Sequence, residues 1–124
     1  MQLPEKGLVL IYGLPGVGKS SFIALLEKPQ GYRRKRISHD IGYQELRNQS
    51  EELEREARTE GRCIIVEMDV DLKGQHSGYV IRHLSEFTVY ISKPGRYEVV
   101  KARLPVLEKG SFSFEKGIQP DDSN

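Results

Sequence analysis

Three short, nearly continuous apolar runs mark the sequence, at residues 8–12, 63–66 and 87–91. Each run is flanked by glycine, charged residues or a turn sequence. A strand exposed on one face alternates apolar and polar residues, whereas a strand buried on both faces of a parallel sheet does not. The three runs therefore predict buried, parallel strands.

Segments with helical spacing separate these runs. Residues 18–27 carry apolar side chains three and four positions apart before Pro29 ends the pattern. Residues 43–60 are rich in helix formers, with a thin apolar stripe and a stop at Gly61. Shorter helices are expected around residues 79–84 and from about residue 96 until Pro105. Alternating strands and helices imply right-handed crossovers, and so an α/β domain over residues 1–124 with helices on both sides of a small, mainly parallel sheet of four to five strands.

Composition adds limits on location and partners. The 124 residues carry a formal net charge of +1, so overall charge selects no partner. The single cysteine, Cys63, excludes an intrachain disulfide and is expected to be a buried core residue. No signal-peptide pattern or membrane-length apolar run is present, which predicts a cytoplasmic protein without a membrane partner.

The stretch GLPGVGKS, from Gly13 to Ser20, directly follows the first apolar run. The pattern G-x-x-x-x-G-K-[ST] between a strand and a helix is typical of a phosphate-binding loop. Glycines let successive backbone N–H groups turn inward around a phosphate, while Lys19 adds a positive charge and the Ser20 hydroxyl suits Mg²⁺. The predicted nucleotide-binding residues are Gly13, Leu14, Pro15, Gly16, Val17, Gly18, Lys19, Ser20 and Ser21.

Candidate carboxylates follow two of the predicted strands. Glu67 is the first acid after residues 63–66, and we interpret it as a catalytic or metal-linked group. Asp69 would lie on the same side if the strand continued, and Asp71 is a weaker candidate in a turn-like sequence. Asp40 is expected at the carboxyl end of a short second strand in Ile37-Ser38-His39-Asp40. It would serve an acceptor hydroxyl there, or else Asp40 or Ser38 caps the next helix.

The basic stretch at residues 33–36, RRKR, allows two interpretations. Four successive cations beside Tyr32 would attract a nucleic-acid end in a salt-dependent manner. The alternative is a solvated loop ahead of an edge strand.

Taken in order, GLPGVGKSS, ISHD, IIVEMD and a late segment with Arg103 resemble the small P-loop kinases of the polynucleotide-kinase, zeta-toxin and seryl-tRNA-kinase group. The resemblance implies the three-layer α/β/α P-loop NTPase fold, ATP and Mg²⁺ as cofactors, and Arg103 as the charge-stabilising lid residue. It also implies that residues 109–124 are an incomplete lid, with Gln119-Pro120 at the start of a helix. The chain departs from the family at Tyr43, where an arginine is usual, and at Glu67 and Asp69, where Asp and Asn are usual.

Two functions remain open from the sequence. The first is an ATP-dependent phosphotransferase with Lys19, Asp40, Glu67 and Arg103 as catalytic residues, Ser20 and Glu67 as metal ligands, and a small molecule or nucleic-acid end as acceptor. The second is a nucleotide-binding ATPase module or switch without its own acceptor chemistry. The tail also leaves two origins open: a domain cut from a longer protein, or a reduced relative of these kinases.

Overall fold

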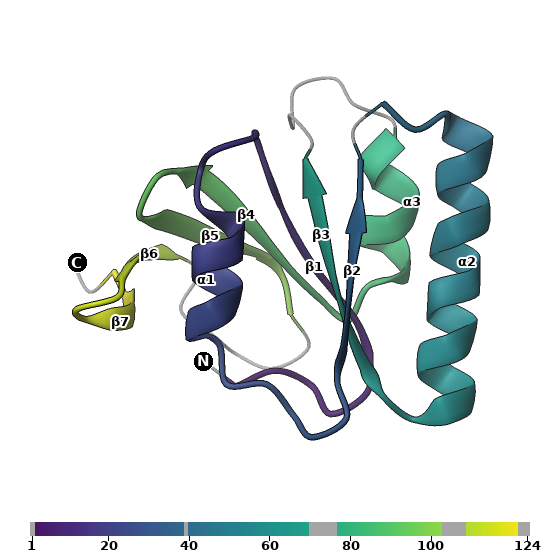
Figure 1. The fold of residues 1–124 in the computed structure, drawn as a ribbon, viewed down its shortest axis with the longest axis horizontal. Coiled ribbons are helices and arrows are strands. Elements are labelled where there is room, and N and C mark those ends of the chain that lie inside the picture. Colours follow the sequence, from purple (N-terminus) through teal and green to yellow (C-terminus); the bar gives the residue numbers. More distant parts are fainter. Residues whose placement is uncertain (1, 39, 70–76, 103–108, 122–124) are drawn as a thin grey trace.

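The computed structural model describes residues 2–38, 40–69, 77–102 and 109–121. Helices and strands alternate as far as β4, and the later described elements are strands (Figure 1). In chain order the elements are β1 (Gly7–Gly13), α1 (Lys19–Leu25), β2 (Arg33–Ile37), α2 (Tyr43–Glu60), β3 (Cys63–Asp69), α3 (Ser77–Leu84), β4 (Phe87–Lys93), β5 (Arg96–Lys101), β6 (Lys109–Ser113) and β7 (Gly117–Pro120).

All strands of the described residues join one seven-stranded sheet in the order β2-β3-β1-β4-β5-β6-β7. The first four strands in this order are parallel to one another. The pairs β4–β5, β5–β6 and β6–β7 are antiparallel. The sheet is therefore mixed, with a parallel half that carries the helical connections and an antiparallel half that follows as a meander.

This architecture corrects the predicted fold class. A three-layer α/β/α P-loop NTPase fold with four to five mainly parallel strands was expected, but the described chain has a seven-stranded mixed sheet and three helices. The expected helix from residue 96 is strand β5 instead. Only Pro94 and Gly95 separate β4 from β5, and Gly95 has φ +78°, as the third position of a tight type II turn requires. Such a turn sends the chain straight back along β4 and leaves no crossover for a helix.

The end of the chain also differs from expectation. The helix predicted to start at Gln119-Pro120 is strand β7, which pairs with β6 through Phe112↔Ile118 and its neighbours. Gly117, with φ +71°, begins β7 after the turn. The described residues 109–121, part of the stretch expected to be an incomplete lid, therefore form a hairpin, and a strand replaces the helix expected from Gln119-Pro120.

Two apolar clusters lie on the two faces of the sheet. In Figure 1, α2 and α3 lie side by side on one face and α1 lies on the other. One cluster joins alternate residues of β1 and β3 to α1 and to the meander, including Phe22, Tyr97 and Phe112. The other joins the remaining residues of these strands to α2 and α3, including Leu46, Leu53 and Ile81. Burial on both faces explains the continuous apolar runs, which lie within β1, β3 and β4 as predicted.

Helix α2 spans the predicted residues 43–60. Leu46, Leu53 and Ala57 are buried along one stripe, and Gly61 ends the helix in the left-handed conformation. Within the described part of the chain, no helix combines the length and apolar character that crossing a bilayer requires.

Candidate active site

The glycine-rich loop connects the carboxyl end of β1 to the start of α1. A side chain at Gly13 would place its Cβ 2.7 Å from the Ile91 carbonyl oxygen, so the close approach of β1 and β4 requires glycine there. Gly16 and Gly18 adopt φ values of +84° and +98°, which other residues rarely adopt. The three glycines of the motif are thus required by this backbone path. Because α1 has only seven residues, an anion at this loop would interact with loop amides and Lys19 more than with the helix dipole.

Lys19 turns back beneath the loop and is buried. Its Nζ donates to the carbonyl oxygens of Gly13 at 3.1 Å and Leu14 at 2.8 Å. It also forms an ion pair with Asp69 Oδ1 at 2.7 Å. Two opposing effects act on the pKa of the Asp69 carboxyl. Burial raises this pKa, but the hydrogen bonds and charges of Lys19 and Arg36 together lower it by more, so the pKa lies below its usual value. Asp69 is therefore a buried, ionised partner of the loop lysine.

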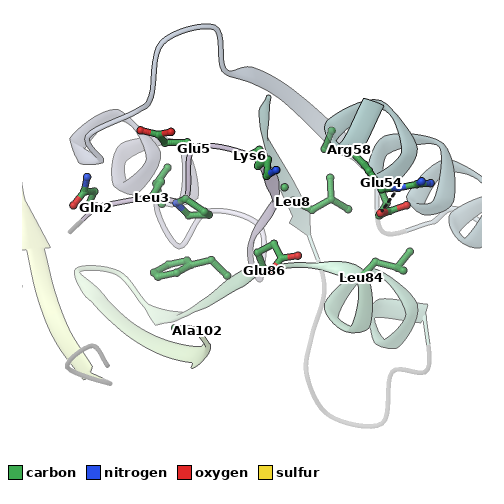
Figure 2. A pocket seen from close by; sticks show the side chains of 14 residues that line it. Gln2, Leu3, Glu5, Lys6, Leu8, Glu54, Arg58, Leu84, Glu86 and Ala102 are labelled. Carbon is green, nitrogen blue, oxygen red and sulfur yellow. Dashed lines mark hydrogen bonds and ion pairs between the residues drawn. The ribbon is translucent and has the colours of Figure 1, made fainter. Parts of the chain in front are cut away.

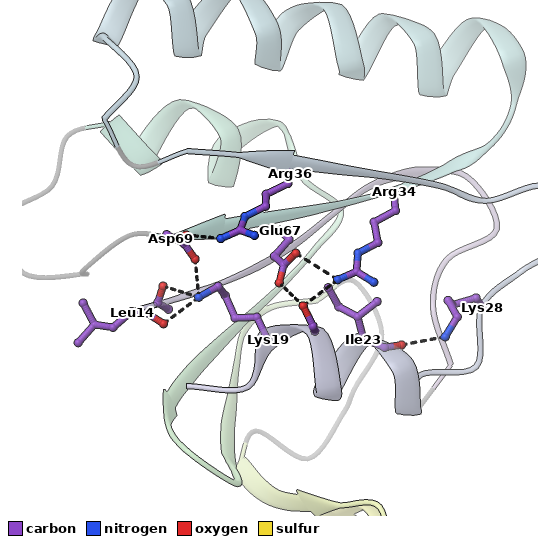
Figure 3. A network of polar contacts seen from close by, with 10 residues as sticks. Leu14, Lys19, Ile23, Lys28, Arg34, Arg36, Glu67 and Asp69 are labelled. Carbon is purple, nitrogen blue, oxygen red and sulfur yellow. Dashed lines mark hydrogen bonds and ion pairs between the residues drawn. The ribbon is translucent and has the colours of Figure 1, made fainter. Parts of the chain in front are cut away.

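Glu67 lies beside this pair, as Figure 3 shows, and it contacts Ser20. The Ser20 hydroxyl donates to Glu67 Oε1 at 2.9 Å. Strand β3 continues through Asp69, so Glu67 and Asp69 project to the same side, two residues apart along the strand. The pairings Ile11↔Glu67 and Gly13↔Asp69 bring both acids next to the end of β1. The sheet register thus delivers two carboxylates to one loop.

Two arginines of β2 complete the network. Arg34 Nη2 donates to Ser20 Oγ and to Glu67 Oε2, each at 3.1 Å. Arg36 donates to Asp69 Oδ2 at 2.9 Å. Arg33 lies on the opposite side of the strand and pairs with Glu56 of α2. The stretch RRKR is therefore the edge strand itself rather than a loop ahead of it, and each of its arginines has a carboxylate partner.

The site has the donor chemistry that a divalent cation needs. Mg²⁺ prefers oxygen ligands, and a serine hydroxyl and a carboxylate lie in contact here. The positively charged guanidinium of Arg34 already donates hydrogen bonds to Ser20 Oγ and Glu67 Oε2. Ser20 and Glu67, the two predicted metal ligands, thus lie in direct contact with each other.

The remaining predicted residues lie elsewhere. Asp40 is exposed on the turn between β2 and α2, past the end of the strand, and accepts a hydrogen bond from Ser38. The N-cap of α2 is Gly42, without a side-chain hydrogen bond, so the capping role considered for Ser38 and Asp40 is wrong. Arg103 and Asp71 lie outside the described residues.

Sequence reasoning missed Arg34 and Arg36 as site residues. The signal was available: alternate residues of a strand share a face, so an extended RRKR stretch divides its cations between two faces. Interpreting residues 33–36 as a loop left no reason to place Arg34 and Arg36 on the same face.

Two hollows compete with the loop as candidate sites. One, of about 740 Å³, lies at the amino ends of β1 and β4, with an apolar floor that includes Leu3, Leu8 and Leu84 (Figure 2). Charged side chains, among them Glu5, Lys6 and Glu86, also line this hollow, but the Lys19 network lies elsewhere. A recess of about 390 Å³ lies between the end of β2 and the start of α2, and Arg36 lines it. Because charged side chains converge at the carboxyl ends of the parallel strands, we take that edge as the functional one.

No protein-family model matches the chain, and a search of curated proteins finds no match. Together with the seven-stranded mixed sheet, this result overturns the assignment to the polynucleotide-kinase, zeta-toxin and seryl-tRNA-kinase group.

Proposed function

We propose that the protein binds the Mg²⁺ complex of a nucleoside triphosphate, ATP being favoured, and transfers its γ-phosphoryl group to a hydroxyl acceptor. One observation carries the proposal: Lys19, Ser20, Glu67 and Asp69 converge on a single glycine-rich loop. Loop amides and a lysine bind phosphate, and a hydroxyl beside a carboxylate binds the accompanying cation. The resemblance to a kinase family plays no part in this argument.

Each residue has a definite task in the proposed complex. Lys19 would leave Asp69 and bind phosphate oxygens instead. Its ammonium group lies against the loop, and the loop would surround these oxygens. Ser20 and Glu67 hold the cation. When bound, Mg²⁺ would neutralise charge on the phosphate oxygens. Loop residues Leu14 to Val17 and Ser21 line the remainder of the nucleotide path.

The recess at the end of β2 is the proposed acceptor site. It lies beside Arg36, which also contacts Asp69, so acceptor and phosphate loop share one side chain. Asp40 lies on the turn beside this recess and is the proposed base for the acceptor hydroxyl. The hydroxyl oxygen forms a bond to the γ-phosphorus, the bond from that phosphorus to the β–γ bridging oxygen breaks, and the hydroxyl proton passes to Asp40. The acceptor is a small molecule or a nucleic-acid end.

A second function is an ATPase module or switch with no acceptor chemistry. The exposure of Asp40 favours it, because an open site admits water as a competing acceptor. Both functions begin with the same nucleotide complex, and they differ in the molecule that receives the phosphoryl group.

A labelled-phosphate assay separates the two functions. The protein is incubated with Mg²⁺ and γ-labelled ATP together with nucleosides, sugars, and RNA or DNA ends. Transfer predicts label on one acceptor class, and a loss of 10²-fold or more in Asp40→Asn with unchanged ATP binding. Glu45→Gln is the matched control, since Glu45 lines the same recess but has no proposed part in proton transfer. Label found only in free phosphate would contradict transfer and support the switch.

We further propose a cytoplasmic location. Cys63 is buried and free of disulfides, and burial raises the pKa of its thiol to about 11. A thiol of this kind is unreactive, in keeping with a structural role in a reducing compartment.

A further inference from the structure

Arg34 lies where the proposed function requires a metal ion. One terminal nitrogen, Nη2, is 3.1 Å from Ser20 Oγ and 3.1 Å from Glu67 Oε2. The same hydroxyl donates to the other oxygen of Glu67. The guanidinium therefore bridges the two groups predicted to be metal ligands, and it competes for them with any divalent cation.

Neighbouring arginines on the same strand behave differently. Arg33 points to the opposite face and pairs with Glu56 of α2, away from the loop. Arg34 and Arg36 point to the loop face, as alternate residues of a strand must. The partner of Arg34 is largely buried, with the Glu67 side chain 8% exposed, while the Arg34 side chain is 39% exposed. Arg34 can therefore be withdrawn into solvent, whereas Glu67 would lose its direct ion-pair partner.

The net charge around the loop also favours binding of a nucleoside triphosphate. Lys19, Arg34 and Arg36 face Glu67 and Asp69, so three cations and two carboxylates leave a formal charge of +1. A nucleoside triphosphate brings several negative charges, and guanidinium groups bind phosphate through paired N–H donors. Arg34 and Arg36 thus add two positive charges to that of Lys19 at the loop.

We propose that Arg34 releases Ser20 and Glu67 when a divalent cation binds them, and that its guanidinium then contacts the phosphates of the bound nucleotide. This inference rests on the proposed function and adds Arg34 to its catalytic residues. Arg36 has the complementary, positioning task. When Lys19 turns from Asp69 to phosphate, Arg36 keeps that buried carboxylate paired at 2.9 Å. Arg34 thus changes its partners, whereas Arg36 keeps its ion pair with Asp69.

The first test uses Mn²⁺ alone, measured by the electron paramagnetic resonance signal of free Mn²⁺ in nucleotide-free protein. Removing the competing guanidinium in Arg34→Ala is expected to tighten Mn²⁺ binding about tenfold. Arg33→Ala is the matched control, because it removes an arginine of the same strand whose ion pair lies away from the loop. Equal or weaker Mn²⁺ binding by Arg34→Ala, in protein shown to be folded by circular dichroism, would overturn the displacement.

The second test uses Mg-ATP. Loss of a cation that contacts the transferred phosphoryl group is expected to lower kcat about 10²- to 10³-fold, with a smaller change in KM. Arg33→Ala is expected to turn over like the unmodified protein, and Arg34→Lys to recover part of the loss. A kcat unchanged by Arg34→Ala would overturn the phosphate contact. If unmodified protein neither binds nor turns over Mg-ATP, the proposed function fails, and the Mn²⁺ result still decides whether Arg34 occupies a cation site.

Discussion

Replacing Lys19 by alanine separates the structural and ligand-binding tasks of this side chain. In the ligand-free protein Lys19 is 4% exposed and satisfies two loop carbonyls together with Asp69. Alanine removes all three contacts and leaves no cation inside the loop. The variant should therefore lose stability without ligand and lose the response to nucleotide.

The structural loss can be bounded from the partners that remain. Removing one member of a buried ion pair typically costs about 3–5 kcal/mol, because the other charge stays buried. Here Asp69 keeps Arg36 at 2.9 Å, so the cost should lie below this range, at about 2–3 kcal/mol. In a chain of this size, that loss corresponds to a melting temperature about 10 °C lower.

The ligand response has a separate magnitude. A ligand at about a hundredfold excess over its Kd stabilises the folded state by about 2.7 kcal/mol. Unmodified protein in saturating Mg-ATP should therefore melt about 10 °C higher than without it. Lys19→Ala should show a much smaller shift, since it removes the cation that lies against the loop carbonyls. Differential scanning fluorimetry with and without Mg-ATP measures both quantities in one experiment.

Lys28→Ala is the matched control for this experiment. Lys28 also donates to backbone carbonyls, of Ile23 at 2.8 Å and Leu26 at 3.1 Å, but at the far end of α1. Its replacement should lower stability slightly and leave the Mg-ATP shift intact. Equal shifts in Lys19→Ala and unmodified protein would refute the reasoning, because the nucleotide would then bind away from the loop.

Two further predictions concern stability. The lowered pKa of Asp69 means that its ion pairs stabilise the folded state above the ordinary value of 3.8 and are lost as the pH falls through the folded-state value. The free energy of unfolding in urea should therefore differ most between unmodified protein and Asp69→Asn near neutral pH, and the difference should narrow below about pH 4; a constant difference would contradict this assignment. Phe112 of β6 packs edge-on against Phe22 of α1, with ring centroids 5.1 Å apart, so Phe112→Ala should cost about 3 kcal/mol. A cost below about 1 kcal/mol would show that the meander adds little to this core.

The parallel half of the sheet could be predicted because its signals are local. Continuous apolar runs mark strands buried on both faces, and the glycine motif marks the turn from β1 to α1. The stripe through Leu46, Leu53 and Ala57, with Gly61 as its stop, gave the bounds of α2. In each case the residues that form the element also carry the pattern.

The antiparallel half was missed because one turn decides its course. Residues 96–101 have apolar positions compatible with either a helix or a strand, and the choice is made by Pro94 and Gly95. A two-residue turn enforces a hairpin, and β6 and β7 then add to the exposed edge of β5. A short apolar segment can fit the residue spacing of a helix or of a strand, and its length is too small to distinguish the two from sequence.

The site residues also divide into those marked by a local pattern and those that depend on long-range contacts. Lys19, Ser20 and Glu67 were named from the motif and the strand end, whereas Arg34 and Arg36 depended on knowing that their segment is a strand. Their carboxylate partners are 33 residues away in sequence and are brought close by the parallel register Arg36↔Glu67. Contacts of this kind cannot be read from a local pattern.

The ion pairs at the loop also determine which ligand it should accept. Lys19 and Arg34 can turn to phosphate only by leaving Asp69 and Glu67, which are both largely buried. Asp69 retains Arg36, but Glu67 retains only the Ser20 hydroxyl among the contacts of this network. An anion arriving alone would therefore leave Glu67 buried beside a neutral partner, at a cost that offsets the new phosphate contacts. A triphosphate that arrives with its own divalent cation replaces the charge that Arg34 withdraws, so the network itself should favour metal-complexed nucleotide over free phosphate or metal-free nucleotide.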